Sequence, residues 1–265
     1  MTARLPATHY PTRTATVAEL DAVTLVANRL DRASDRGLDE TTVSQAVPPG
    51  RLDLEQAMQA DAQAQLGLPR TATPWQRKRR RTLRAPALRL GIAIDHSPSM
   101  HDMLDAAMGA AWVVEAAAAR ARQARSTVAL ATFDTSAHLI ESGSTTHVPT
   151  LETAEPGAVN HSGALPEVLD LLRARLELDH YPDDSRLLVI ISDSVLQSPQ
   201  RAAHAIQELH AAGVRLLWIS IDEEAPGYLP DGVATLTADA QSLLEALPGA
   251  VTDALATAYG PGGYQ

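Results

Sequence analysis

The chain contains no cysteine, one phenylalanine and one lysine among its 265 residues. Without cysteine it can form no disulfide, no thiolate metal site and no cysteine nucleophile. Aromatic residues make up only 3% of a chain that is 45% hydrophobic, so aliphatic side chains must fill the core. No segment approaches the roughly 20 apolar residues that a membrane span needs, and the first thirty residues do not resemble a signal peptide. We therefore expect a cytoplasmic protein that does not bind membranes.

Charge is distributed unevenly along the sequence. Residues 1–85 hold 13 Lys+Arg and 9 Asp+Glu, a net charge of +4, whereas residues 86–265 hold 9 and 23, a net charge of −14. This asymmetry predicts a domain boundary near Pro86. The acidic C-terminal part argues against nucleic acid as its ligand and favours cations or basic partner surfaces.

The first 85 residues are predicted to form a helical extension with a basic linker. Apolar residues at helical spacing indicate one helix over 14–33 and another within 48–69, joined by loops. The basic run WQRKRRRTLR at 75–84 has the composition of a nucleic-acid patch, but it is a single short run beside an acidic domain. We interpret it as a solvated or intramolecularly docked linker and expect no nucleic-acid partner.

From residue 87 onward, continuous apolar runs alternate with helical stretches, which is typical of parallel strands covered on both faces. A run at 137–142 follows its predecessor too closely for a crossover, so it should pair antiparallel at an edge. The sequence predicts an α/β fold with a doubly wound, mostly parallel sheet in strand order 3-2-1-4-5, and allows a sixth strand at 233–237. The other predicted strands are 88–94, 126–133, 186–192 and 214–221, and the helices are 100–123, 162–178, 198–213 and 237–258. Trp112 and Trp218 lie in apolar runs and are predicted to be core residues.

Polar residues gather where two of these strands end. The segment DHSPSM follows the first strand and contains Asp95, Ser97 and Ser99, and the strand at 186–192 leads into Asp193. In the predicted order the two strands are neighbours where the order reverses, which is where ligands bind in doubly wound sheets. The alternate spacing of the two serines puts both hydroxyls on the same side as the first aspartate.

A hard divalent cation fits this rim better than other ligands. Phosphate binding needs a glycine-rich loop and a lysine, but residues 95–99 hold no glycine and the only lysine is Lys78. A hydrolytic triad of Asp95, His96 and Ser97 is excluded because consecutive residues of an extended segment point to opposite sides. Hydroxyl and carboxylate oxygens suit Mg²⁺, with Mn²⁺ or Ca²⁺ as alternatives.

A loop near the rim is expected to supply a further ligand, and two other interpretations of the rim residues remain open. The loop at 155–163 reaches the same edge, and we expect Ser162 or Asn160 to contribute an oxygen. Helix capping by one of the two rim serines is also sensible, although it would explain neither aspartate. A transition-metal site is a less favoured alternative, since a lone surface histidine is commoner than a ligand; its candidates are His96, His101 and His161.

DHSPSM resembles the D-x-S-x-S motif of von Willebrand factor type A domains, and VIISDS at 189–194 resembles the strand-ending acidic motif of that family. The resemblance covers about residues 87–258. With PPGRLD and NHSGAL it is greatest to the intracellular bacterial branch that includes the cobaltochelatase subunit and partners of MoxR-type AAA+ ATPases. It implies a metal-ion-dependent adhesion site (MIDAS) whose residues are Asp95, Ser97, Ser99 and Asp193.

The sequence departs from the family pattern at several positions. Val159 aligns with the family threonine and offers no oxygen, so Asn160, His161 or Ser162 would have to compensate. Pro98 replaces the usual glycine of the first motif, and Ser194 replaces the glycine that usually follows the second aspartate.

Together the residues and the resemblance predict a non-enzymatic protein-interaction module. It would bind Mg²⁺ at the rim and, through it, an acidic residue of a partner, either a AAA+ ATPase or the target of one. We expect no catalytic residue, because the acids are committed to the cation and the rim has no lysine. The alternatives are a metal-chelatase component or metal-dependent hydrolase acting directly in catalysis, and a structural subunit with a degenerate metal site.

Overall fold

The computed structural model describes residues 10–34, 38–82, 86–122, 125–140, 143–152 and 163–258. The chain forms two compact units, one made of Met1–Ser34 with Pro86–Gln265 and the other of Asp35–Ala85. Pro86, where the charge asymmetry predicts a boundary, begins the second stretch of the larger unit. The helix predicted at 14–33, however, belongs to the larger unit, so the smaller unit is an insertion and not an N-terminal extension.

The larger unit is built on a six-stranded sheet whose order is β11-β10-β9-β5-β6-β7. All neighbouring strands pair parallel except β6 and β7, which pair antiparallel at one edge. This arrangement confirms the predicted fold class and strand order, and the sixth strand is present as β11. The strands are β5 (Leu88–Asp95), β6 (Ser126–Phe133), β7 (Ala137–Ile140), β9 (Ser185–Ser192), β10 (Arg215–Ile221) and β11 (Ala234–Ala238).

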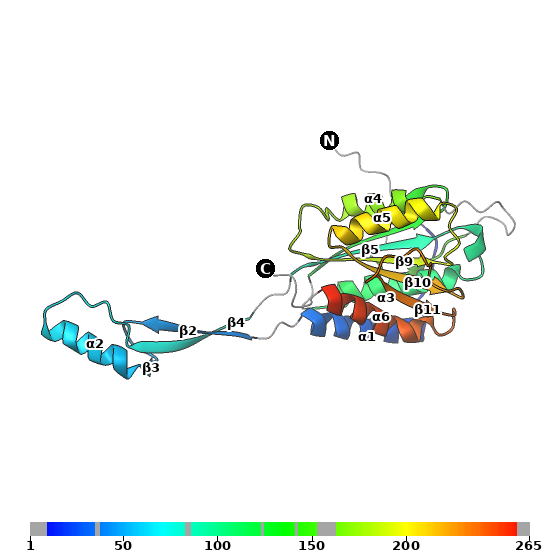
Figure 1. The fold of residues 1–265 in the computed structure, drawn as a ribbon. Coiled ribbons are helices and arrows are strands. Elements are labelled where there is room, and N and C mark those ends of the chain that lie inside the picture. Colours follow the sequence, from blue (N-terminus) through cyan, green and yellow to red (C-terminus); the bar gives the residue numbers. More distant parts are fainter. Residues whose placement is uncertain are drawn as a thin grey trace. The chain divides into compact units, whose positions relative to one another are not determined.

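Helices cover both faces of this sheet (Figure 1). On one face, α4 and α5 enclose a core that includes Ala93, Phe133, Ile190 and Trp218. On the other face lie α1, α3 and α6, with Trp112 of α3 fully buried, so both tryptophans are core residues as predicted. The helices are α1 (Val17–Ser34), α3 (Leu104–Arg120), α4 (Leu165–Arg175), α5 (Pro199–Ala211) and α6 (Leu243–Ala258), with a short 3-10 helix, η1 (Pro98–Met100), before α3. None of the helices among the described residues is both long and apolar enough to cross a lipid bilayer.

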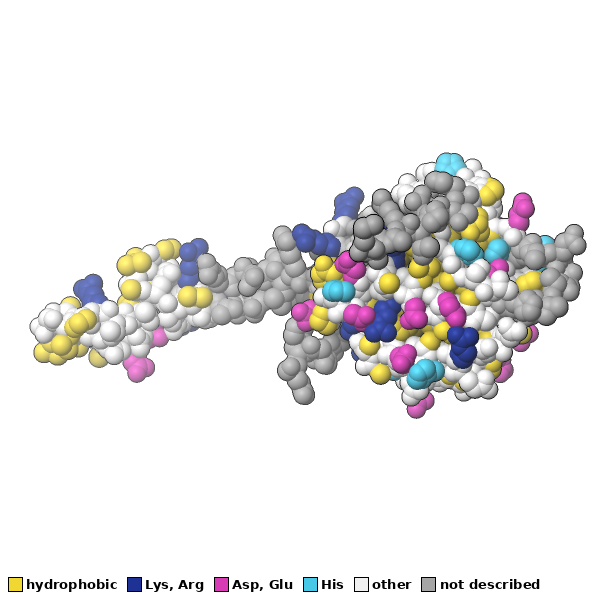
Figure 2. All heavy atoms as spheres, turned by 90° about the horizontal axis from the view of Figure 1, so that it is seen from above, with side chains coloured by type: hydrophobic (Ala, Val, Ile, Leu, Met, Phe, Trp, Pro, Cys, Tyr) yellow, Lys and Arg dark blue, Asp and Glu magenta, His cyan; other side chains and the backbone are white. Residues whose placement is uncertain are grey.

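The smaller unit is a three-stranded antiparallel sheet in the order β2-β4-β3, with one helix, α2. Its elements are β2 (Leu38–Gln45), β3 (Arg51–Leu52), α2 (Leu54–Gln65) and β4 (Trp75–Thr82). The basic run is thus largely a central strand, and its interpretation as a linker was wrong. A strand without alternating apolar residues gives no periodic signal in the sequence. It can still form, because backbone hydrogen bonds between strands do not depend on side-chain type. Figure 2 shows hydrophobic side chains at the surface of this unit, on the left of the view.

The N-terminal segment is firmly attached to the larger unit. Strand β1 (Thr12–Thr14) pairs antiparallel with β8 (His147–Pro149), and α1 packs on α3 and α6 with Val26 and Leu30 buried. Neither short strand was expected from the sequence. This packing explains why residues 14–33 do not form part of an independent extension.

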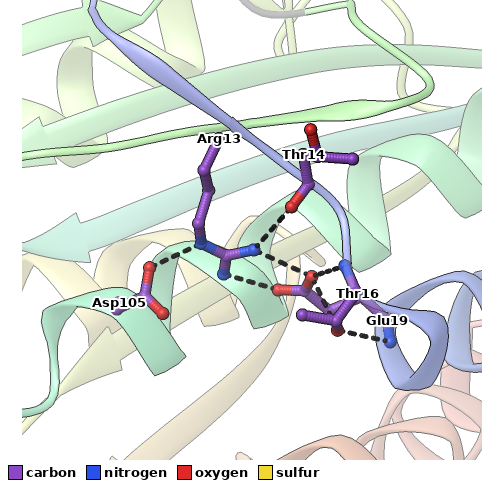
Figure 3. Close-up of polar contacts among 5 residues, drawn as sticks. All are labelled: Arg13, Thr14, Thr16, Glu19 and Asp105. Atoms are coloured by element: carbon purple, nitrogen blue, oxygen red, sulfur yellow. Dashed lines mark hydrogen bonds and ion pairs between the residues drawn. The ribbon is translucent and has the colours of Figure 1, made fainter.

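A buried carboxylate anchors the start of α1 (Figure 3). Arg13 donates two hydrogen bonds to Glu19, at 2.7 and 2.9 Å, and a third to Asp105 of α3 at 2.7 Å. Burial tends to raise the pKa of Glu19, but hydrogen bonds from Arg13 and Thr16 outweigh it and lower that pKa below its ordinary value. A Cβ atom at Gly109 of α3 would lie 2.5 Å from a carboxylate oxygen of Glu19, so glycine allows this close approach.

Candidate metal site

The registers of three neighbouring strands place Asp95, Ser192 and Ser220 at one level. Ile94 is paired with Ile191, so the residues that follow them are level, and Ser192 is paired directly with Ser220. All three side chains have no exposed surface. These side chains lie just beyond the core residues on the face of the sheet that α4 and α5 cover. They form a row of polar groups at the carboxyl edge of the sheet, where the apolar core ends.

Asp95 is held by hydrogen bonds to both carboxylate oxygens. Its Oδ1 accepts from the backbone N–H of Ser97 at 2.9 Å, and its Oδ2 accepts from the Ser192 hydroxyl at 2.7 Å. Burial raises the pKa of Asp95 to about 6, the nearby Asp193 carboxylate adds to this rise, and the hydrogen bonds oppose it. A carboxyl with this pKa is mostly ionised at neutral pH, although it is enclosed by protein.

The hydroxyls of Ser97 and Ser99 lie 3.0 Å apart. Ser97 is fully buried, whereas Ser99 is exposed to solvent, so the pair extends from the interior to the surface. Ser97 occupies the N-cap position of η1, but its side chain makes no capping hydrogen bond there. The capping interpretation therefore does not account for the Ser97 hydroxyl.

Asp193 follows β9 and is 3% exposed. Its Oδ1 accepts a hydrogen bond from the backbone N–H of Val195 at 3.0 Å, which fixes the carboxylate in the turn after the strand. Its charge contributes to the raised pKa of Asp95, so the two carboxylates interact as the strand order predicted.

Ser194 adopts a left-handed backbone conformation with φ of 69°. The resemblance places a glycine at this position, and a left-handed conformation costs a non-glycine residue roughly 1–2 kcal/mol. Hydrogen bonds offset part of this cost, because the Ser194 hydroxyl pairs with Ser220 at 2.9 Å and accepts from the Trp218 indole at 3.3 Å. The Ser194 N–H also donates to the Ser192 hydroxyl at 3.0 Å, so a continuous network runs from Trp218 to Asp95.

Tyr228 contacts this network through Trp218. Its ring makes an edge contact with Trp218, with ring centroids 6.4 Å apart. Its hydroxyl is buried, and the structure shows no hydrogen-bond partner for it among the described residues. Burial and the charge of Asp95 raise the pKa of this phenol, so the phenol stays protonated and remains a hydrogen-bond donor.

The structure brings together four of the five predicted metal ligands: Asp95, Ser97, Ser99 and Asp193. The fifth, Ser162, lies outside the described residues, as do Val159, Asn160 and His161. Sequence reasoning missed Ser192, Ser220 and Tyr228. The only sequence signal for the first two is that each is a polar residue at or next to the end of an apolar run, and this signal points to Asp95 only when the strand register is known.

Two alternative sites find no support in the described part of the chain. The His96 ring contacts the backbone carbonyl of Glu152 at 2.9 Å, while Asp95 binds Ser97 and Ser192, so no Asp-His-Ser relay forms. Within the described ranges, no group of three or more His, Cys, Asp or Glu side chains is placed to hold a metal. A site built from His96 and His101 would need ligands from outside those ranges.

Comparison with known proteins finds similarity only among solved structures. No protein-family model and no curated protein matches the chain. A von Willebrand factor type A protein from Catenulispora acidiphila aligns with a TM-score of 0.47 and 17% identity over 64% of this chain and 43% of its own. Proximal thread matrix protein 1 from the mussel byssus, with a zinc-occupied MIDAS motif, aligns with a TM-score of 0.46 and 13% identity over 64% and 46%.

Manganese-loaded TRAP protein from Plasmodium vivax aligns with a TM-score of 0.39 and 14% identity over 63% of this chain and 74% of its own. This chain spans less than half of the length of the bacterial and mussel proteins. At these scores and identities, the similarities carry no argument about ligands or partners.

Proposed function

We propose that this chain is a non-enzymatic protein-interaction module that binds a divalent cation through Asp95, Ser97, Ser99 and Asp193 and holds a partner's carboxylate through that cation. The observation that carries the proposal is the pair of serine hydroxyls, 3.0 Å apart, beside the buried Asp95 carboxylate. Neither the fold nor the capping of η1 requires this pair.

The distance between the two hydroxyls is compatible with Mg²⁺ as the cation. Magnesium binds oxygens at about 2.1 Å in near-octahedral geometry, so adjacent ligand oxygens lie about 3.0 Å apart. Calcium–oxygen distances of about 2.3–2.6 Å would require roughly 3.3–3.7 Å in the same arrangement. Ser97 Oγ and Ser99 Oγ are hydrogen-bonded to each other at 3.0 Å, so they already lie at the spacing of two adjacent magnesium ligands.

The carboxylates would balance the charge of the cation. Both oxygens of Asp95 already accept hydrogen bonds from the protein, which suits it to reach the ion through a bridging water. A third hydroxyl, expected from Ser162, would come from outside the described residues. The charges of Asp95 and Asp193 together equal that of a divalent ion, which favours the loaded state over two adjacent unpaired carboxylates.

The proposed partner offers an acidic side chain. A carboxylate from outside the chain completes the coordination shell of a cation that is held by few protein oxygens. Following the family resemblance of the sequence, we propose a AAA+ ATPase or its target as this partner, in the cytoplasm. No observation on the described residues favours the chelatase or hydrolase alternative.

Calorimetric titration with Mg²⁺ and Mn²⁺ tests the metal site. Wild-type protein should bind one divalent cation, whereas Asp95→Ala and Ser99→Ala should lose most of the binding. Ser136→Ala is a matched control, because Ser136 is an exposed serine in the β6–β7 turn, bonded to Asp134 and His138. Wild-type protein that binds neither cation at millimolar concentration would overturn the proposal in favour of a structural subunit.

A further inference from the structure

Helix α2 and its C-cap residue Leu66 present their large apolar side chains to solvent. Leu54, Met58 and Leu66 are 72%, 74% and 72% exposed, and the chain between them includes the exposed Ala62. No residue of α2, which is described over its whole length, is buried. These four residues, spaced every fourth position, form one ridge along the helix, which we call the α2 ridge.

The less exposed side of α2 faces its own unit and carries small or polar residues, namely Gln56, Ala57, Ala60 and Gln63. Gln63 hydrogen-bonds the hydroxyl and backbone of Thr71, and Gln56 accepts from the backbone N–H of Thr73. An amphipathic helix normally buries its apolar stripe and exposes its polar one. In α2 the apolar residues on the inward side are only alanines, and the large apolar side chains lie on the solvent side. The folding of its unit therefore does not account for the α2 ridge.

The chemistry of α2 argues against a lipid surface as the ligand of this ridge. Helices that lie on membranes usually carry Lys and Arg on their polar face. Helix α2 has neither, and its two charged residues are Glu55 and Asp61. Helix α2 therefore lacks the cationic face of a membrane-surface helix, so the ridge is better suited to another protein surface.

The α2 ridge is complementary to itself when two copies run antiparallel. With the two-fold axis between Met58 and Ala62, Leu54 of each copy lies opposite Leu66 of the other, and each methionine lies opposite an alanine. Large side chains facing small ones can interdigitate, as close packing requires. An isologous contact of this kind closes as a dimer with two-fold symmetry.

Charge at the helix ends favours the same pairing. The first turn of α2 carries Glu55 and is preceded by Asp53, its N-cap. Beyond the other end, the chain turns back at Leu66 and Gly67 and exposes Arg70 before Thr71 bonds to Gln63. Antiparallel pairing brings the acidic end of each helix to the basic end of the other.

We infer that α2 is a homodimerisation helix, and that two copies of the chain associate through antiparallel α2 ridges. This role is independent of the proposed metal site, which lies in the other unit. A helix of this length buries less than the about 1,600 Å² of a standard interface, so we expect a dimer that dissociates at low micromolar concentration.

Sedimentation velocity of the full chain over a micromolar concentration series tests the inference. Wild type should pass from monomer to dimer as its concentration rises, and Met58→Glu should stay monomeric, because it places charges in the centre of the contact. Val17→Glu is the matched control: Val17 is 76% exposed, lies in the larger unit and begins α1, where an acidic residue is tolerated. A wild type that remains monomeric, or a Met58→Glu variant that dimerises equally, would overturn the inference.

Thiol cross-linking tests the antiparallel orientation, and the chain has no native cysteine to interfere. Met58→Cys mixed with a tagged Ala62→Cys should give the mixed dimer in excess over either homodimer. If Met58→Cys cross-links to itself more efficiently, the helices are parallel and the proposed pairing is wrong.

Discussion

The hydroxyl of Ser192 donates a 2.7 Å hydrogen bond to Asp95, joining two residues that are 97 positions apart in the chain. The bond exists because β5 and β9 are adjacent and in register up to the residues just before them. It holds one oxygen of the carboxylate while Ser97 holds the other.

Ser192→Ala should therefore destabilise the protein. It leaves one oxygen of a fully buried carboxylate unsatisfied, which costs roughly 1–3 kcal/mol of unfolding free energy. Urea unfolding in the presence of a chelator measures this loss without metal effects. The exposed Ser136→Ala should change stability by less than about 0.5 kcal/mol. Equal losses of unfolding free energy in the two variants would show that the hydrogen bond from Ser192 to Asp95 does not stabilise the protein.

Metal-free stability should depend on pH through Asp95. Burial holds its pKa at about 6, above the ordinary 3.8, so the folded state binds this proton more tightly than the unfolded state. The stabilising contribution is complete below the unfolded pKa and is lost as pH rises through about 6. We expect the unfolding free energy of wild type, relative to Asp95→Asn, to decrease between about pH 4 and pH 6.5 and then to level off. Urea unfolding in chelator measures both proteins, and a constant difference would contradict the assignment.

Substitutions at Ser194 should separate backbone strain from hydrogen bonding. Ser194→Ala loses the bond to Ser220 and keeps the left-handed conformation, whereas Ser194→Gly loses the bond and relieves the strain. We expect the glycine variant to be more stable than the alanine variant by about 1 kcal/mol, as measured by denaturant unfolding. The opposite order would mean that the turn does not keep its positive φ in solution.

Gly109→Ala should loosen the attachment of α1. The new methyl group would lie 2.5 Å from the Glu19 carboxylate and push it away from Arg13. We expect a loss of about 1–3 kcal/mol, typical of overpacking a close contact. Adding Gly109→Ala to Glu19→Ala should cost much less than the sum of the single changes, because the steric conflict is gone. Additive effects in this double-mutant cycle would contradict the contact.

The third hydroxyl of the metal site can be located by two substitutions outside the described residues. Val159→Thr adds an oxygen at the position that the family resemblance assigns to threonine, so Mg²⁺ binding should tighten if the loop keeps that register. Calorimetric titration compares it with wild type and Ser162→Ala. If Val159→Thr has no effect and Ser162→Ala weakens binding, Ser162 is the ligand that replaces threonine.

The central sheet could be predicted from the sequence because its strands are continuous apolar runs, and continuous runs need helices on both faces. The meeting of Asp95 with Asp193 followed from strand order alone. The supporting serines were missed for a physical reason. Ser192 and Ser220 belong to the strands themselves, and a single polar residue at the end of an apolar run reveals its partner only when the register is known.

The region before Pro86 was harder to predict. Helix α1 shows its apolar stripe in the sequence, but nothing in that stripe tells whether it packs on an independent domain or on α3 and α6. Strands β2 and β4 have polar residues at most positions, so the period that identifies half-buried strands is missing.

Since residues 35–85 are inserted between α1 and β5, the larger unit is assembled from two separate stretches of chain. After a single cut within the insertion, the described contacts that hold α1 to the rest of that unit would be its packing on α3 and α6, side-chain hydrogen bonds such as Arg13 to Asp105, and the β1–β8 pairing. The molecule thus resembles a two-fragment complementation system whose halves happen to be covalently joined. A synthetic peptide of the α1 region could compete for its own docking face, and the boundary of the insertion would be the natural place to divide the protein into a split reporter.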